Sequence, residues 1–152
     1  QYDYNVRYAY PSGAPKIVIP GLPGDEKVLQ FKHGLYEMTD QYVVTPSGWS
    51  TGVTKVRYNG VVVHAGHYGG FYPEDVLWFL KLALREQGAF AGGRGPRILT
   101  DRTGVLVYVN TLEPGSTFSR YRGREEIFNY ETDVSCGFHE YWGMSFLSVY
   151  QS

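Results

Sequence analysis

The stretch VTKVRYNGVVVHAG, residues 53–66, decides how the rest of the chain is interpreted. It places the dipeptide Asn59-Gly60 between two runs of valine and other strand-favouring residues. Asparagine and glycine are the residues that a type I′ turn requires, because both of its central positions take positive φ. The stretch therefore predicts an antiparallel β-hairpin in which Tyr58 lies opposite Val61.

A two-residue turn also fixes which side chains of the hairpin share a face. The expected register sets Val56 opposite Val63, on a face that suits the core. It sets Lys55 opposite His64 on the other face, because successive side chains of a strand alternate between faces. One side of the hairpin should thus be buried and the other wetter.

Composition extends this prediction to the whole chain. Its 152 residues include 14 tyrosines and 19 glycines, a pairing typical of half-buried strands joined by tight turns. The length favours a single domain, 1–152, with a sizeable core. We therefore expect a mainly β fold, an antiparallel β-sandwich or barrel. Further strands are expected at residues 16–19, 28–31, 42–44 and 143–152, with a second hairpin at 97–112 that turns at 100–104.

One segment, YPEDVLWFLKLALREQG at residues 72–88, is typical of a helix instead. Pro73 suits the first turn, and the two acidic residues after it complement the positive end of the helix dipole. We expect one packed α-helix over about residues 73–87. Its apolar residues extend around most of the circumference and include Trp78 and Leu82, so the helix is expected to be covered on more than one side.

Charge and cysteine content argue against several classes of protein. The formal net charge is −1, which gives no field that would favour nucleic acid or an anionic membrane surface. The longest apolar run, residues 105–109, suits a strand buried on both faces and is far shorter than the roughly 20 residues that span a bilayer. The single Cys136 excludes an intrachain disulfide and a cysteine-rich zinc module. We expect no nucleic-acid partner and no membrane insertion.

Two pairs of residues are candidates for chemistry. His64 and His67 have a spacing that places them on opposite faces of a continuous strand, so no metal site is expected. Cys136 and His139 have the same spacing, and a reactive thiol also needs a partner that lowers its pKa. We therefore expect no catalytic residue, no metal and no cofactor, and interpret the protein as a non-enzyme.

Acidic residues and a glycine-rich loop leave further alternatives. A glycosidase needs two carboxylates about 5–10 Å apart, and the sequence does not say which of its acidic residues would pair. GGRGPR, residues 92–97, could cradle a phosphate with Arg94 or Arg97, but it lacks the end of a P-loop and is interpreted as a mobile loop. RYRGREE, residues 120–126, is interpreted as a solvated turn. The carboxylates available for a pair are Asp40, Asp101, Glu125, Glu126 and Glu140.

The chain opens with QYDYNVRYAY, residues 1–10, in which tyrosine occupies four of five alternate positions. On a strand these rings would share one face. At an interface each ring supplies apolar area while its hydroxyl reaches the wetter rim, whereas a phenol buried in a core must find a hydrogen bond. We expect a partner chain to cover this face. Together with the flank of the helix, the expected assembly surface comprises Tyr2, Tyr4, Tyr8, Tyr10, Trp78 and Leu82.

Two functions from different classes fit these expectations. The first is a non-catalytic structural or assembly module, a homo-oligomer or a partner of other structural subunits, of the kind repeated in virions, phage tails and surface appendages. An extracellular or virion location would accompany it. The alternative is a lectin-like, carbohydrate-binding module, because exposed aromatic rings can stack on sugar faces. Its expected glycan contacts are Trp49, Tyr141 and Trp142.

Overall fold

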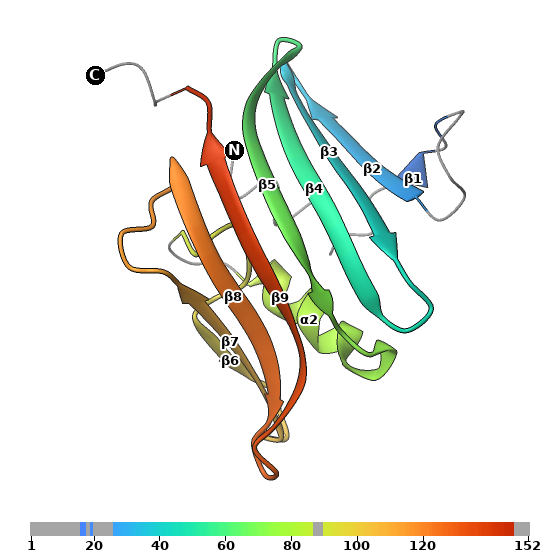
Figure 1. Cartoon of the computed structure of the whole chain (residues 1–152), viewed down its shortest axis with the longest axis vertical. Helices are drawn as coiled ribbons and strands as arrows, with labels where there is room; N and C mark the ends of the chain where they lie inside the picture. The colour runs from blue at the N-terminus through green and yellow to red at the C-terminus, as the bar shows by residue number, and fades with distance from the viewer. Residues whose placement is uncertain (1–15, 18, 20–25, 87–89, 148–152) are drawn as a thin grey trace.

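The computed structural model describes residues 16–17, 19, 26–86 and 90–147. Within them the chain forms nine strands, which pair into one antiparallel sheet, and a single short α-helix. The mainly β fold with one packed helix is thus confirmed, and the curved sheet is consistent with a barrel-like form (Figure 1). The strands are β1 (Lys16–Ile17), β2 (Glu26–His33), β3 (Tyr36–Val44), β4 (Trp49–Tyr58), β5 (Val61–Phe71), β6 (Ile98–Thr100), β7 (Leu106–Leu112), β8 (Arg120–Asn129) and β9 (Val134–Ser145).

The sheet consists of two meanders, in each of which consecutive strands are neighbours. The strand order is β1-β2-β3-β4-β5-β9-β8-β7-β6, so the first meander runs from β1 to β5 and the second from β6 to β9. The pairing of β5 with β9 joins them. The segment between the meanders contains a 3₁₀ turn, η2 (Glu74–Val76), and the helix α2 (Leu77–Arg85), which lies against one face of the sheet (Figure 1). We call this face the inner face and the opposite one the outer face.

The hairpin predicted from residues 53–66 is present, with one irregularity. Asn59 and Gly60 both take positive φ, 48° and 83°, and Tyr58 pairs with Val61 as expected. The predicted pairs of Val56 with Val63 and of Lys55 with His64 are wrong. A register shift lies between residues 56 and 57, so Val56 pairs with His64 and Lys55 with Ala65. The extra residue of this β-bulge turns the His64 side chain to the inner face.

The helix is shorter than predicted. The segment 74–85 is helical, but its first three residues form a 3₁₀ turn and the backbone becomes extended at Glu86. One side of α2 packs on Tyr108 and Ile127 of the inner face, and that contact forms the main core. Trp78 and Leu82 on its other side are exposed within one chain, so a second cover for the helix stays a prediction. The helical residues buried in this core are Val76, Phe79, Leu80, Ala83 and Leu84.

Two segments of the second meander differ from the sequence interpretation. Residues 120–126 belong to strand β8 rather than to a solvated turn, and every second side chain of that strand is buried. The run 105–109 is buried on one face only, where Tyr108 has no exposed surface, while Val107 and Val109 are partly exposed. Of the last strand predicted at residues 143–152, residues 143–145 belong to β9 and residues 146–147 do not, while residues 148–152 lie outside the described residues. Among the described residues, no helix is both long and apolar enough to cross a membrane.

Three tyrosines of the inner face lie flat across glycines of neighbouring strands. The directly opposed pairs are Gly52 with Tyr68, Tyr121 with Gly143, and Gly123 with Tyr141. A Cβ atom at any of these glycines would meet the phenol end of the opposing tyrosine closer than real Cβ atoms approach. Glycine is therefore required at these positions, because it leaves the surface against which the ring lies.

Candidate functional site

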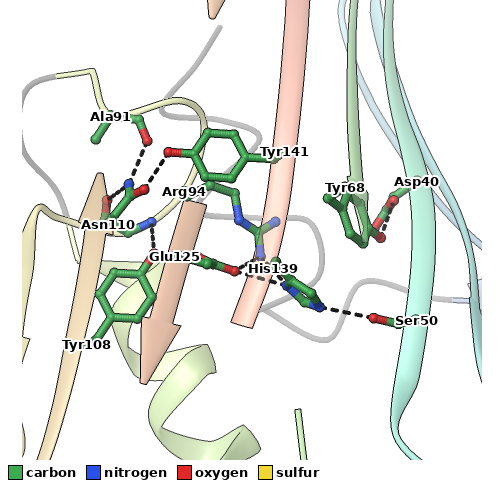
Figure 2. A network of polar contacts seen from close by, with 11 residues as sticks. Asp40, Ser50, Tyr68, Ala91, Arg94, Tyr108, Asn110, Glu125, His139 and Tyr141 are labelled. Atoms are coloured by element: carbon green, nitrogen blue, oxygen red, sulfur yellow. Dashed lines mark hydrogen bonds and ion pairs between the residues drawn. The ribbon is translucent and has the colours of Figure 1, made fainter. Parts of the chain in front are cut away.

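Polar side chains converge on the inner face, where an apolar core would be expected. Strands of both meanders contribute them, and so does the loop that follows α2 (Figure 2). We call this set the inner-face polar network. It comprises Asp40, Ser50, Tyr68, Arg94, Tyr108, Asn110, Glu125, His139 and Tyr141.

Glu125 is the centre of the network and its side chain is completely buried. Its carboxylate accepts hydrogen bonds from Arg94 Nη2 at 2.5 Å, from His139 Nδ1 at 3.0 Å and from the Tyr108 hydroxyl. Burial alone would raise the pKa of Glu125, but the charge of Arg94 and the hydrogen bond from His139 outweigh it and bring the pKa to about 2. The carboxylate is therefore ionised throughout the physiological range.

The imidazole of His139 lies between a carboxylate and a hydroxyl. Its Nδ1 is 3.0 Å from Glu125 Oε1, and its Nε2 is 3.0 Å from Ser50 Oγ. Burial lowers the pKa of His139, and although Glu125 opposes this effect, the net direction is downward. The ring is then neutral near pH 7. Nδ1 lies 3.0 Å from the Glu125 carboxylate, which can only accept, and 3.2 Å from Arg94 Nη2, which already donates to that carboxylate. We therefore assign the single ring proton to Nδ1, so that Nε2 accepts from the Ser50 hydroxyl.

A loop of residues 90–97 carries Arg94 into the network. Asn110 holds this loop, since its Nδ2 donates to the carbonyl oxygens of Ala91 at 2.8 Å and Gly95 at 2.9 Å. The Tyr141 hydroxyl donates to the Asn110 side-chain oxygen. The sequence interpretation of residues 92–97 as a mobile loop is therefore wrong, because these hydrogen bonds and the Arg94–Glu125 ion pair fix it to the sheet.

Asp40 forms a second buried carboxylate of the network. It accepts hydrogen bonds from the Tyr68 hydroxyl at 2.9 and 3.1 Å and from Thr54 Oγ1 at 3.3 Å. Burial raises its pKa to about 6, although the hydrogen bond from Tyr68 acts in the opposite direction. Asp40 therefore exchanges its proton close to neutral pH, unlike Glu125.

A cavity of about 160 Å³ lies between the inner face and α2. Its lining includes the apolar side chains of Met38, Val56, Leu80 and Leu84. It also includes several polar members of the network. These polar lining residues are Asp40, Ser50, Tyr68, Arg94 and His139.

A second hollow, a groove of about 500 Å³, lies on the outer face. Trp49 and Trp142 both line it and are 52% and 40% exposed, so the fold brings together two of the three predicted glycan contacts. Trp142 stacks on His67, with ring centres 4.0 Å apart and planes 5° apart. Tyr141 is 3% exposed and lies on the inner face, because neighbouring residues of a strand point to opposite faces.

The histidine and cysteine candidates are also separated. His64 lies on the inner face against Tyr121, while His67 lies on the outer face, as the strand period predicts. Cys136 packs on the edge of the main core, whereas both ring nitrogens of His139 bond other members of the network. In the described part of the chain, no group of three or more His, Cys, Asp or Glu side chains is placed to hold a metal ion.

The five candidate carboxylates divide between the two faces and a turn. Asp40 and Glu125 reach the inner face, as described above. Asp101 accepts hydrogen bonds from the Thr103 hydroxyl and from backbone amides in the turn between β6 and β7. Glu126 and Glu140 pair with an arginine on the outer face. The residues Tyr2, Tyr4, Tyr8 and Tyr10 lie outside the described residues.

Sequence reasoning missed Ser50 and Tyr68, considered Arg94 only as a phosphate ligand, and did not place Glu125. One signal was available for Glu125, because it alternates with Tyr121, Gly123 and Ile127 in a run that suits the buried face of a strand. Arg94 has no such periodic signal, since it lies on a loop. Comparison of the chain with protein-family models, curated proteins and solved structures found no match.

Proposed function

We propose that the protein binds a small, uncharged, partly polar molecule in the inner-face cavity. The observation that supports this proposal is the cavity itself, whose lining combines apolar side chains with a few hydrogen-bonding ones. Pockets for small molecules have this composition, with a few placed polar groups in an otherwise apolar lining.

The volume of the cavity limits the size of the ligand. An engineered apolar cavity of about 150 Å³ holds one benzene molecule. The inner-face cavity, at about 160 Å³, is therefore suited to a single six-membered ring with small substituents.

The charges around the cavity favour a neutral ligand. Arg94 and Glu125 compensate each other, and Asp40, which at a pKa of about 6 is mostly ionised at pH 7, already accepts hydrogen bonds from Tyr68 and Thr54. A buried charge without a partner costs several kcal/mol, so a charged ligand would be disfavoured. The ring should instead carry a hydroxyl or carbonyl group, which Ser50, Tyr68 or Asp40 can hydrogen-bond.

A contribution to the stability of the fold is a weak explanation for the presence of the inner-face polar network. Buried ion pairs often contribute no more than apolar residues of the same volume. Buried groups whose pKa values are strongly perturbed, next to a cavity, are more typical of binding and catalytic sites.

A thermal-shift panel tests the proposal. Phenol, benzyl alcohol and cyclohexanol are the neutral probes, with benzoate and benzylamine as charged counterparts of similar size. At 100 times its dissociation constant a ligand adds about 2.7 kcal/mol of stability, which raises the melting temperature of a chain of this length by about 5–10 °C. A Ser50→Leu variant, which fills the polar end of the cavity, should lose the shift. Thr51→Val on the outer face is its matched control. Charged probes that act as strongly as neutral ones, or an unaltered shift in Ser50→Leu, would contradict the proposal.

A second candidate function is carbohydrate binding at the outer-face groove. The exposed rings of Trp49 and Trp142 support it, since sugar CH groups pack on indole faces and Glu140 in the same groove can accept hydroxyl hydrogen bonds. Trp49→Ala or Trp142→Ala should abolish binding to a glycan array. Trp78→Ala on α2 is the control, because it removes an exposed indole that does not line the groove. Assembly through Trp78 and Leu82 stays a further proposal.

A further inference from the structure

We propose that Ser50, His139 and Glu125 form a hydrolytic triad that cleaves a small uncharged ester held in the inner-face cavity. This inference rests on the proposed function, because the ester would occupy the cavity assigned to a neutral ring. Ser50 is the nucleophile, His139 the general base and acid, and Glu125 the residue that orients the imidazole.

The geometry of the three residues supports these roles. A nucleophile, its base and the group that orients the base are joined by hydrogen bonds of about 2.6–3.2 Å. Both links in this protein, Ser50 Oγ to His139 Nε2 and His139 Nδ1 to Glu125 Oε1, measure 3.0 Å. Ser50 and His139 line the cavity, whereas Glu125 has no exposed surface. Figure 2 shows the imidazole of His139 between the side chains of Glu125 and Ser50.

The protonation states are the ones that a triad needs. Glu125 is ionised and holds the ring proton on Nδ1, so the Nε2 lone pair meets the Ser50 hydroxyl. Neutral imidazole can then accept the hydroxyl proton as the oxygen attacks. Glu125 afterwards stabilises the imidazolium through the same hydrogen bond.

The reaction needs no reagent besides ester and water. Ser50 Oγ bonds to the ester carbonyl carbon while its proton passes to His139 Nε2. The carbon–oxygen bond to the alcohol breaks, and the alcohol leaves with the proton from Nε2. Water then attacks the acyl group on Ser50 and gives a proton to Nε2. Finally the bond to Ser50 breaks, its hydroxyl regains that proton, and the carboxylic acid departs.

Arg94 influences which esters react fastest at this site. Arg94 is one of the residues that line the cavity, and its positive charge there favours the negative oxygen of the tetrahedral intermediate. However, Arg94 Nη2 lies 3.2 Å from His139 Nδ1 and disfavours the imidazolium. The base is therefore weak, and esters with good leaving groups, such as phenyl esters, should react fastest.

The other carboxylate arrangement that the sequence left open fits less well. Asp40 and Glu125 have pKa values of about 6 and about 2, as a glycosidase acid and its partner would. Glu125, however, is enclosed by its three hydrogen-bond donors and is not among the residues that line the cavity. It can orient His139 but does not reach a substrate.

The test uses p-nitrophenyl acetate with the full chain at neutral pH. We expect a burst of p-nitrophenolate, and intact-protein mass with peptide mapping should place one acetyl group on Ser50. Ser50→Ala should abolish acetylation at that residue and lower p-nitrophenolate release at least about 100-fold, because His139 then has no nucleophile to activate. Ser135→Ala is the matched control, since that serine also hydrogen-bonds a glutamate, Glu126, but on the outer face. Circular dichroism checks that each variant is folded.

The failure of this inference can be distinguished from failure of the proposed function. If the wild-type protein binds phenol but forms no acyl adduct, the triad is wrong and the binding site stands. If it neither binds phenol nor reacts, both are wrong. An adduct on any other residue, or hydrolysis unchanged in Ser50→Ala, also overturns the triad.

Discussion

Replacing Arg94 by methionine should destabilise the protein more than any change at an exposed charge. The substitution keeps an unbranched apolar stem and removes the cation that compensates the fully buried Glu125. Removing one partner of a buried ion pair typically costs about 3–5 kcal/mol. Because domains of this size are stable by only about 5–15 kcal/mol, the expected loss is a large share of the total.

The pKa of Glu125 gives an independent magnitude. It falls from its ordinary value of 4.5 to about 2 on folding, and one pKa unit corresponds to about 1.4 kcal/mol, so the ionised carboxylate contributes about 3 kcal/mol. A folded-state pKa below the unfolded value gives stability that is complete above about pH 5 and is lost as the pH falls towards 2. In Arg94→Met, burial acts on Glu125 without that cation, so acidification should stop destabilising the protein.

Urea denaturation at intervals between about pH 7 and pH 3 measures both effects. The difference in unfolding free energy between wild type and Arg94→Met should be about 3–5 kcal/mol at pH 7 and should narrow steadily below pH 5. Adding Glu125→Gln to Arg94→Met should recover much of the loss, because it removes the uncompensated charge. A loss below about 1 kcal/mol at pH 7, or one independent of pH, would refute the reasoning.

Three further predictions concern other parts of the fold. Gly123→Ala should lower the free energy of unfolding by about 1–3 kcal/mol in urea denaturation, because the added Cβ would clash with the ring of Tyr141. The control Gly69→Ala should lower it less, because a Cβ there meets no side chain so closely. Equal losses would contradict the packing of the ring on the glycine. Tyr68→Phe removes a hydrogen bond that lowers the pKa of Asp40, so that pKa should rise above 6 in an NMR titration. In the wild type, the folded-state pKa of Asp40 lies above its unfolded value, so the free energy of unfolding should decrease as the pH rises from about 4 to 6 and Asp40 ionises. The double variant Trp78→Ser with Leu82→Ser should be a folded monomer where the wild type is an oligomer, as measured by light scattering. The double variant Tyr4→Ser with Tyr8→Ser should behave in the same way. A wild-type protein that is already monomeric would contradict both predictions.

The sequence predicted what local chemistry determines. Asn59-Gly60 specifies its turn through the positive φ of two residues, and the acidic start of residues 74–85 specifies a helix end. The bulge that turns His64 inward has no such signal, because it depends on how β5 fits β4 along its whole length. Residues 120–126 were misinterpreted because most of their charges lie on the exposed face of a strand, and the charge on the buried face, Glu125, is compensated by Arg94 only in the folded protein.

The candidate site was less predictable than the fold because its residues come from several strands that only the tertiary structure brings together. Trp49 and Trp142 were identified individually, but their meeting in one groove follows from the strand order. Ser50, His139 and Glu125 belong to three strands, and no motif in the sequence indicates that these strands are brought together.

The two-meander topology has a consequence for how the protein folds. Within each meander, contacts join strands that are close in sequence, so their hairpins close short loops and can form early. The hydrogen bond from Ser50 to His139 spans 89 residues and exists only when β5 has paired with β9. Loop-closure entropy makes such a contact late in folding. We therefore expect the cavity to form only after β5 and β9 have paired. A ligand bound there would slow unfolding while leaving the rate of hairpin formation unchanged.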